Sequence, residues 1–308
     1  MDMQFLYFLE KIRNSVLDTL MLLVTQLGEE TAFLVLALIV FWCVDKYKGY
    51  FILGVGFIGT ILNQFLKLWF RIPRPWIIDE NFTILEQARE AASGYSFPSG
   101  HTQSAVGTFG ALAYTEKNSW IRWSAIAVAI LVPFSRMYIG VHTPLDVFVS
   151  IAVAVLLIVI LKPLVLDFDH RCLRFVIGAM VLIGAAFMCF VHLYPFPADI
   201  DAYNLESGYK NAYTLVGSLA GLLVVYIVDE KWLKFKTDAP FIGQCLKVFL
   251  GLCVVLVVKS GLKAPLNLIL GESFGRAVRY CLVVIVAGVL WPMSFRFFRK
   301  MGQKSVLR

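Results

Sequence analysis

Three short blocks of polar residues stand out in a chain that is otherwise mostly apolar. They read KLWFRIPRP from Lys67, PSGH from Pro98, and SRMYIGVHTPLD from Ser135. Together they hold cations, two histidines, a carboxylate and a Ser-Gly turn within the first half of the chain. Charged side chains are costly inside a membrane and are seldom kept there without a use. These blocks are therefore where we expect function.

The residue types in the blocks suit the cleavage of a phosphate ester. Such an ester resists attack because its oxygens are negative, so a catalyst neutralises them, supplies a nucleophile and protonates the leaving group. Arginine can hold two of these oxygens at once. Backbone N–H groups at a helix start also favour an anion, and a glycine there lets a phosphate approach the backbone closely. We expect the phosphate to be bound by Lys67, Arg74, Ser99, Gly100 and Arg136.

The remaining groups of the blocks predict the reacting pair. His142 and Asp146 are one helical turn apart at an expected helix start, so the carboxylate can accept a hydrogen bond from one imidazole nitrogen. That contact fixes the tautomer and makes the other nitrogen more basic. We predict His142 as the nucleophile, Asp146 as its support and His101 as the acid that protonates the leaving oxygen. No further cluster has metal-ligand spacing, so we expect no metal and no cofactor.

Each of these residues has an ordinary explanation when it is taken alone. A histidine at a membrane interface anchors a helix, a basic side chain near a helix end snorkels, and an acidic one favours a helix start. The joint occurrence of all three blocks is what favours catalysis.

The composition predicts an all-α polytopic membrane protein. Of the 308 residues, 59% are hydrophobic and 16% are charged, with a mean hydropathy of +0.76. Soluble domains carry about 25% charged residues. The net charge of +7 does not indicate a nucleic-acid partner, because Lys and Arg lie in short loops between apolar runs. The six cysteines are scattered and predict no disulfide framework.

The apolar runs divide the chain into three parts. Residues 4–27 predict one amphipathic helix, and we assign residues 1–30 to it. Residues 31–166 hold the three blocks, and residues 167–308 form a C-terminal transmembrane extension of unknown role. Nine membrane spans are expected: 31–45, 49–70, 101–117, 119–138, 142–165, 174–194, 208–229, 242–262 and 275–297.

The distribution of Lys and Arg predicts the orientation of these spans. Basic residues gather in alternate loops and in the C-terminal tail, whereas the loops that hold 71–100 and 135–142 lie on the other side. The basic side is cytoplasmic by the positive-inside rule. We therefore expect the N-terminus outside, the C-terminus in the cytoplasm, and all three blocks on the extracytoplasmic face.

The three blocks resemble the signature of the type 2 phosphatidic acid phosphatase family. That signature is Lys-x6-Arg-Pro, Pro-Ser-Gly-His and Ser-Arg-x5-His-x3-Asp, and the chain matches it at every position over residues about 30–165. The resemblance implies a metal-independent mechanism with a phosphohistidine at His142. It also implies a six-helix core, of which the amphipathic helix 4–27 is the first, followed by four further transmembrane helices.

The leading hypothesis is an integral phosphatase of the bacterial inner membrane that acts on a lipid phosphate or diphosphate. Undecaprenyl diphosphate, phosphatidylglycerophosphate and phosphatidate are substrates of this type, and the expected partners are this lipid and the surrounding membrane lipids. Two alternatives stay open. Glucose-6-phosphatase shares the signature and acts on a soluble sugar phosphate. A transporter that binds a lipid or an anion without turnover would not need a His-Asp pair. The vanadium haloperoxidases share the signature too, but they are soluble.

Overall fold

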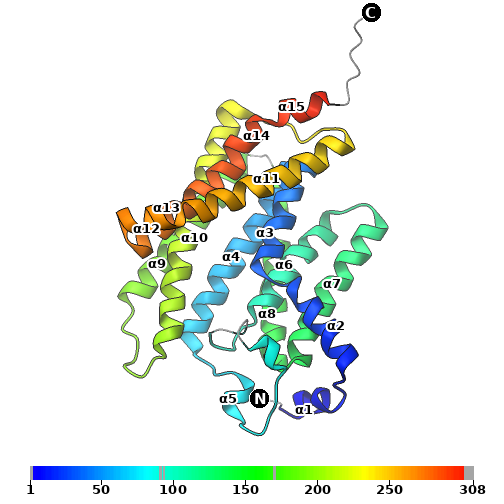
Figure 1. Ribbon diagram of the computed structural model, residues 1–308, viewed down its shortest axis with the longest axis vertical. Coiled ribbons are helices and arrows are strands. Elements are labelled where there is room, and N and C mark those ends of the chain that lie inside the picture. The colour runs from blue at the N-terminus through cyan, green and yellow to red at the C-terminus, as the bar shows by residue number, and fades with distance from the viewer. Residues whose placement is uncertain (1–2, 90–91, 93, 169–170, 302–308) are drawn as a thin grey trace, which may run out of the picture. The chain divides into compact units, whose positions relative to one another are not determined.

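The computed structural model describes residues 3–89, 92, 94–168 and 171–301 (Figure 1). Every regular element in these ranges is a helix. Seven helical segments are long and apolar enough to cross a membrane. The prediction of an all-α polytopic membrane protein is therefore confirmed.

Seven of the nine expected spans meet this test of length and composition. They are Lys46–Ile78, Ser119–Tyr138, Pro144–Asp167, Arg171–Leu193, Ala202–Leu233, Phe241–Leu270 and Glu272–Lys300. The other two are helical but short. Helix α6 covers Gly100–Thr115, and α3 (Glu30–Ile39) continues through η1 to Val44. The segment Glu30–Val44 meets the test of length and composition only when it is counted together with α2, and the two are bent by 54° relative to each other.

The N-terminal amphipathic segment is two helices instead of the expected one. Helix α1 covers Met3–Lys11 and α2 covers Ser15–Gln26. The break is set by Asn14, whose side chain accepts a hydrogen bond from the N–H of Leu17 at 3.1 Å and so caps α2. Asparagine bonds to its own neighbouring backbone, which favours a cap over a helix interior. Both helices bury one face, and both pack against α7 (Ser119–Tyr138).

One compact unit comprises Met1–Leu34, Ile52–Pro163 and Pro195–Gly208. It holds most of α4 (Lys46–Phe70), with α5 (Pro75–Ile78), η2 (Glu86–Ala88), α6, α7 and α8 (Pro144–Lys162). Helix α6 packs against both α7 and α8. Small residues let it come close to its neighbours: a Cβ on Gly107 would meet Val55 at 3.1 Å, and one on Gly110 would meet Ile158 at 3.0 Å. Close backbone approach through glycine is a usual way to pack helices in membranes.

A second unit comprises Val35–Phe51, Leu164–Tyr194 and Tyr209–Arg308. Its elements are η1 (Val40–Val44), η3 (Pro163–Asp167), α9 (Arg171–Leu193), α10 (Ala202–Val228), η4 (Asp229–Leu233), α11 (Phe241–Gly261), α12 (Lys263–Leu270), α13 (Glu272–Ile285), η5 (Val286–Leu290), α14 (Trp291–Met293) and α15 (Phe295–Lys300). Helices α10 and α13 touch through their backbones, because a Cβ on Gly217 would lie 2.1 Å from the carbonyl oxygen of Ala277. Only glycine fits at that contact.

Candidate active site

The first block ends helix α4 and turns the chain back over the site. After Phe70 the backbone of Arg71 is left-handed, with φ 51°, and Pro73 cannot continue the helix. The chain becomes helical again only in the short α5, which begins at Pro75. Lys67, in the last turn of α4, is buried and donates to the carbonyl oxygen of Tyr95. Arg74 is 4% exposed, and its Nε donates to the carbonyl oxygen of Gly94 at 3.0 Å. Both cations are therefore held inside the protein.

The second block starts helix α6. The hydroxyl of Ser99 accepts from the N–H of Thr102 at 3.4 Å and caps the helix. The backbone N–H of Ser99 donates to the carbonyl oxygen of Asp146 at 3.2 Å, which joins the second block to the third. At Gly100 an added Cβ would meet only Asn63 Oδ1, at an ordinary 3.6 Å. Packing within the protein therefore does not require a glycine here, and the position leaves room next to the backbone.

The third block begins at the end of α7. Arg136 is 1% exposed, and its Nη1 donates to the hydroxyl of Thr25 on α2 at 2.7 Å. Its Nε has no hydrogen-bond partner among the residues that the structure describes. A buried charged N–H without a partner is costly. Arg136 thus keeps one donor available for an anion.

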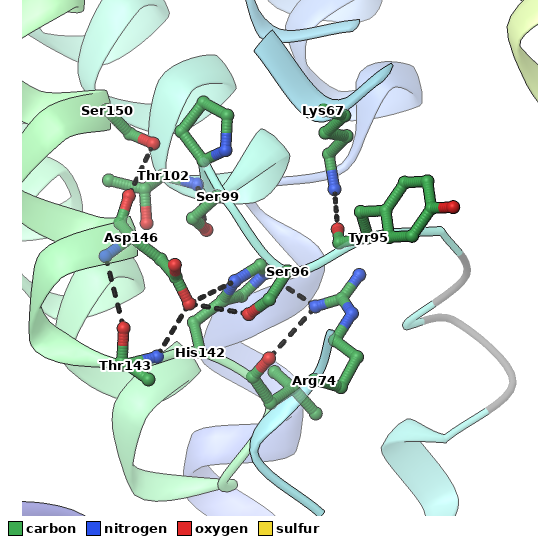
Figure 2. Close-up of polar contacts among 12 residues, drawn as sticks. Lys67, Arg74, Tyr95, Ser96, Ser99, Thr102, His142, Thr143, Asp146 and Ser150 are labelled. Carbon is green, nitrogen blue, oxygen red and sulfur yellow. Dashed lines mark hydrogen bonds and ion pairs between the residues drawn. The ribbon is translucent and has the colours of Figure 1, made fainter. Parts of the chain in front are cut away.

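His142 and Asp146 are fixed by the start of helix α8. Thr143 caps this helix and shares a capping box with Asp146: the hydroxyl of Thr143 accepts from the N–H of Asp146 at 3.3 Å, and Asp146 Oδ2 accepts from the N–H of Thr143 at 2.8 Å. Pro144 occupies the first turn, where its lack of an N–H costs nothing. Asp146 Oδ2 lies 3.4 Å from His142 Nδ1 (Figure 2). The two side chains are thus in contact, although Nδ1 makes no hydrogen bond in the described part of the chain.

The contact between Arg74 and His142 defines the tautomer of the imidazole. Arg74 Nη1 lies 2.9 Å from His142 Nε2, and it also donates to the carbonyl oxygen of Val141 at 2.9 Å. A guanidinium has donors only, so Nε2 accepts and the imidazole is neutral. Its proton is then on Nδ1, which faces Asp146. The lone pair of Nε2 is the one that can attack phosphorus.

The surroundings of His142 keep the imidazole neutral. His142 is 1% exposed and lies in the turn between the spans Ser119–Tyr138 and Pro144–Asp167. Burial, with the positive charges of Arg74, Arg136 and Lys67 close by, holds the pKa of His142 well below its usual value. A neutral imidazole is the form that acts as a nucleophile.

His101 is brought into the same electrostatic environment without direct contact. It lies in the first turn of α6, and the charges of Arg136, Arg74 and Lys67 act on it. Its side chain forms no hydrogen bond with another described residue. The turn between α2 and α3 packs on it closely, because a Cβ on Gly28 would meet the carbonyl oxygen of His101 at 2.9 Å. The structure therefore gathers all eight predicted residues in one unit, with His101 standing apart from the hydrogen-bonded group.

Two supporting side chains were not foreseen from the sequence. The buried hydroxyl of Ser96 donates to Asp146 Oδ2 at 2.6 Å. Thr25 on α2 holds Arg136. Ser96 precedes the PSGH block by two positions, and its closeness to that block was the only available signal. Thr25 is one of many threonines in apolar surroundings, and nothing in the sequence marks it.

The fold and the site together define a polytopic membrane protein with buried cations around a histidine-carboxylate pair. Residues 47–169 match the PAP2 superfamily, and residues 213–303 match the transmembrane extension of a PAP2 superfamily phosphatase. The chain belongs to the PAP2 superfamily. It is a membrane phosphatase, as the three sequence blocks predicted.

Curated relatives support the same class. The chain is 32% identical to undecaprenyl-diphosphatase BcrC of Bacillus subtilis over 146 residues, which cover 47% of this chain and 72% of that protein. It is 29% identical to phosphatidylglycerophosphatase B of the same organism over 177 residues, covering 53% and 81%. With sphingosine-1-phosphate phosphatase 1 of Rattus norvegicus it shares 25% identity over 221 residues, covering 70% and 49%. No solved structure matches the chain.

Proposed function

We propose that this membrane phosphatase hydrolyses the phosphate or diphosphate monoester of a lipid through a phosphohistidine at His142. The observation that carries the proposal is the line Arg74–His142–Asp146, in which Nε2 presents its lone pair while Nδ1 faces a carboxylate. Undecaprenyl diphosphate, phosphatidylglycerophosphate and phosphatidate are the substrate types that we consider. The names of the relatives support a lipid, because each refers to a lipid phosphate or diphosphate.

In the first half of the reaction, His142 Nε2 attacks phosphorus. The P–O bond to the leaving group breaks. His101, which takes up a proton once the negative phosphate offsets the three cations around it, gives that proton to the leaving oxygen. In the structure, Arg74 Nη1 donates to Nε2. When substrate binds, the guanidinium must therefore turn this N–H towards a phosphate oxygen, which frees the lone pair of Nε2. Lys67 and Arg136 neutralise the other oxygens, and the hydroxyl of Ser99 and the backbone N–H of Gly100 donate to them.

In the second half, water attacks the phosphorus of the phosphohistidine and gives its proton to His101. The P–N bond breaks, inorganic phosphate leaves, and the lone pair returns to Nε2. The proton on Nδ1 stays beside Asp146 throughout, where the carboxylate stabilises the positive charge on the phosphorylated imidazole. No other group is needed to balance the reaction.

The location of the site is also part of the proposal. The protein spans the membrane several times. We propose that it lies in a bacterial inner membrane, with the active site outside the cytoplasm, the N-terminus outside and the C-terminus inside. The Lys/Arg bias of the loops supports this orientation. Residues 31–166 would carry the chemistry, with residues 1–30 and 167–308 as flanking parts.

The catalytic proposal is tested by phosphate release from purified protein in detergent. A panel of the three lipid phosphates and glucose 6-phosphate is compared in wild type, His142→Ala and the control His192→Ala, which changes an exposed histidine on α9. We expect lipid phosphates to be preferred, His142→Ala to be inactive and the control to be active. Acid-sparing mass spectrometry should find phosphohistidine at His142. Turnover by His142→Ala above about 1% of wild type would contradict the assignment.

The orientation is tested by labelling single cysteines in intact cells. Asn81→Cys lies in the exposed loop that follows α5, and Lys117→Cys lies in the exposed loop between α6 and α7. Both are made in a background without the six native cysteines. A membrane-impermeant maleimide should label the first and spare the second. The reverse pattern would overturn the proposed orientation while leaving the chemistry untouched.

A further inference from the structure

A basic pocket lies within the second unit, and none of its lining residues belongs to the three sequence blocks. It is formed by η4, the loop that follows it, and helices α14 and α15. Its volume is about 330 Å³, which is at the lower end of the range for ligand pockets. Four basic side chains line it, and none of its lining residues is acidic: Lys234, Lys236, Arg296 and Arg299.

Three of these four cations lack a carboxylate partner. Arg299 pairs with Asp238 at 2.7 Å. The side chains of Lys234, Lys236 and Arg296 form no ion pair or hydrogen bond with the described residues, and all three are exposed. The positive-inside rule accounts for basic residues at a helix end. It does not account for their convergence from two separate segments on one concave site.

The backbone that presents Lys234 is strained and firmly held. Lys234 has φ 42° and ψ 45°, a left-handed conformation that favours glycine. The turn is fixed by Asp229, whose carbonyl oxygen accepts from the N–H of Lys234 at 2.9 Å and whose Oδ1 accepts from the N–H of Phe235 at 3.1 Å. Asp229 Oδ2 is itself paired with Lys46 at 2.6 Å. A lysine kept where glycine would be easier indicates that its side chain has a use.

The far end of the same loop is also anchored. Lys247, which is fully buried on α11, donates to the carbonyl oxygen of Thr237 at 2.8 Å. Gln244 donates to the same oxygen at 2.9 Å. The loop 234–237 is therefore tied at both ends before any ligand arrives. A preorganised pocket loses little conformational freedom on binding.

The rim of the pocket points to a ligand that belongs to the membrane. Trp232 is 71% exposed and Met293 is 60% exposed, and both line the pocket. Tryptophan is enriched where the headgroups of a bilayer meet its apolar core. Apolar side chains at the rim would contact acyl chains, while the cations inside would contact a phosphate.

We propose that this pocket binds the phosphodiester headgroup of an anionic phospholipid. The chemistry of the site is recognition of a phosphate by Lys234, Lys236 and Arg296. Basic pockets between helix ends are suited to such headgroups. The site is independent of the catalytic proposal, because it shares no residue with it and requires no turnover.

The test measures lipid binding by the full-length protein in a non-ionic detergent, using native mass spectrometry. The probes are phosphatidylglycerol, phosphatidylcholine and inorganic phosphate. The test variant carries three substitutions together, which are Lys234→Gln, Lys236→Gln and Arg296→Gln. The matched control is Lys117→Gln, Arg122→Gln, Arg174→Gln, which removes the same charge from other exposed positions. Both variants keep the active-site residues, so lipid that binds at the active site contributes equally to both. The difference in affinity between the two variants therefore measures binding at the pocket.

Wild type and the control should bind phosphatidylglycerol in preference to phosphatidylcholine. Each basic side chain near an anionic lipid is worth about a five-fold change in affinity, so the test variant should bind about 100-fold more weakly. Equal binding by the test variant, or an equal loss in the control, would overturn the site. Competition by inorganic phosphate at the affinity of the lipid would overturn the lipid as its ligand.

Folding of the variants is checked by size exclusion and by thermal unfolding without lipid. If the triple variant is not monodisperse, Arg296→Gln is measured alone, and an affinity about five-fold lower is expected. The charge-preserving variant Arg296→Lys should bind like wild type. An affinity of Arg296→Gln equal to that of wild type would then refute the proposal.

Discussion

Replacing Asp146 by Asn should separate the catalytic role of its carboxylate from its structural role. Oδ2 accepts from the N–H of Thr143 at 2.8 Å and from the hydroxyl of Ser96 at 2.6 Å, and it lies 3.4 Å from His142 Nδ1. The amide oxygen of Asn can take this position and keep the first two bonds. The NH₂ group would then replace Oδ1, which has no hydrogen-bond partner among the described residues. The change thus removes the charge and keeps the shape.

The expected losses in rate and in stability differ greatly. Without the carboxylate, the positive charge on the phosphorylated imidazole is no longer balanced. The corresponding change in a Ser-His-Asp triad lowers kcat by about 10⁴, and we expect a loss of that order here. That factor corresponds to about 5.5 kcal/mol in the activation free energy. Loss of an acidic group at a helix start costs only about 0.3–1 kcal/mol in folding stability.

The assay compares initial rates of phosphate release at saturating lipid phosphate with the Tm of the same samples. The control is Asp79→Asn, which changes an aspartate that is hydrogen-bonded to Tyr7 at 2.7 Å in another part of the same unit. We expect the control to keep its rate, and Asp146→Asn to lose its rate with a small change in Tm. A rate for Asp146→Asn within about tenfold of wild type would refute the reasoning. Asp146 would then be only a helix-start charge.

Three further outcomes are expected. Thr25→Val should lower kcat/KM by about 10- to 100-fold, because it leaves Arg136 Nη1 without its acceptor. The control Thr19→Val, on the same helix, should leave kcat/KM unchanged. Equal effects of the two substitutions would count against a role for Thr25. Orthovanadate should inhibit the enzyme, because vanadate can adopt the geometry of the transferring phosphoryl group. EDTA should not inhibit it, because the basic side chains neutralise the phosphate without a metal ion. Activity that is lost in EDTA and restored by Mg²⁺ would disprove this. Arg279→Met should raise Tm. Arg279 is 5% exposed, and its Nε and Nη1 have no hydrogen-bond partner among the described residues. Each buried polar group without a partner lowers folding stability by about 1–3 kcal/mol. A fall in Tm would contradict this expectation.

Much of the fold was predictable because apolar runs in a membrane protein have few alternatives. Backbone groups in a bilayer must bond within their own segment, so long apolar runs become helices. The break at Asn14 was missed because the amphipathic pattern continues through it, while the capping bond to Leu17 is a local competitor. The expected spans 31–45 and 101–117 are helical with nearly the expected bounds, and they miss the length test only because they are short, as in α6 with its 16 residues.

The sequence by itself determined the chemical content of the site. Residue type fixes what a group can do, and the spacing of His142 and Asp146 around a helix start already implied their proximity. Only the tertiary structure decided which groups touch. The contact of Arg74 with Nε2, the support of Arg136 by Thr25, and the bond from Ser96 to Asp146 join segments far apart in the chain. Such contacts depend on how helices pack, which local pattern does not encode.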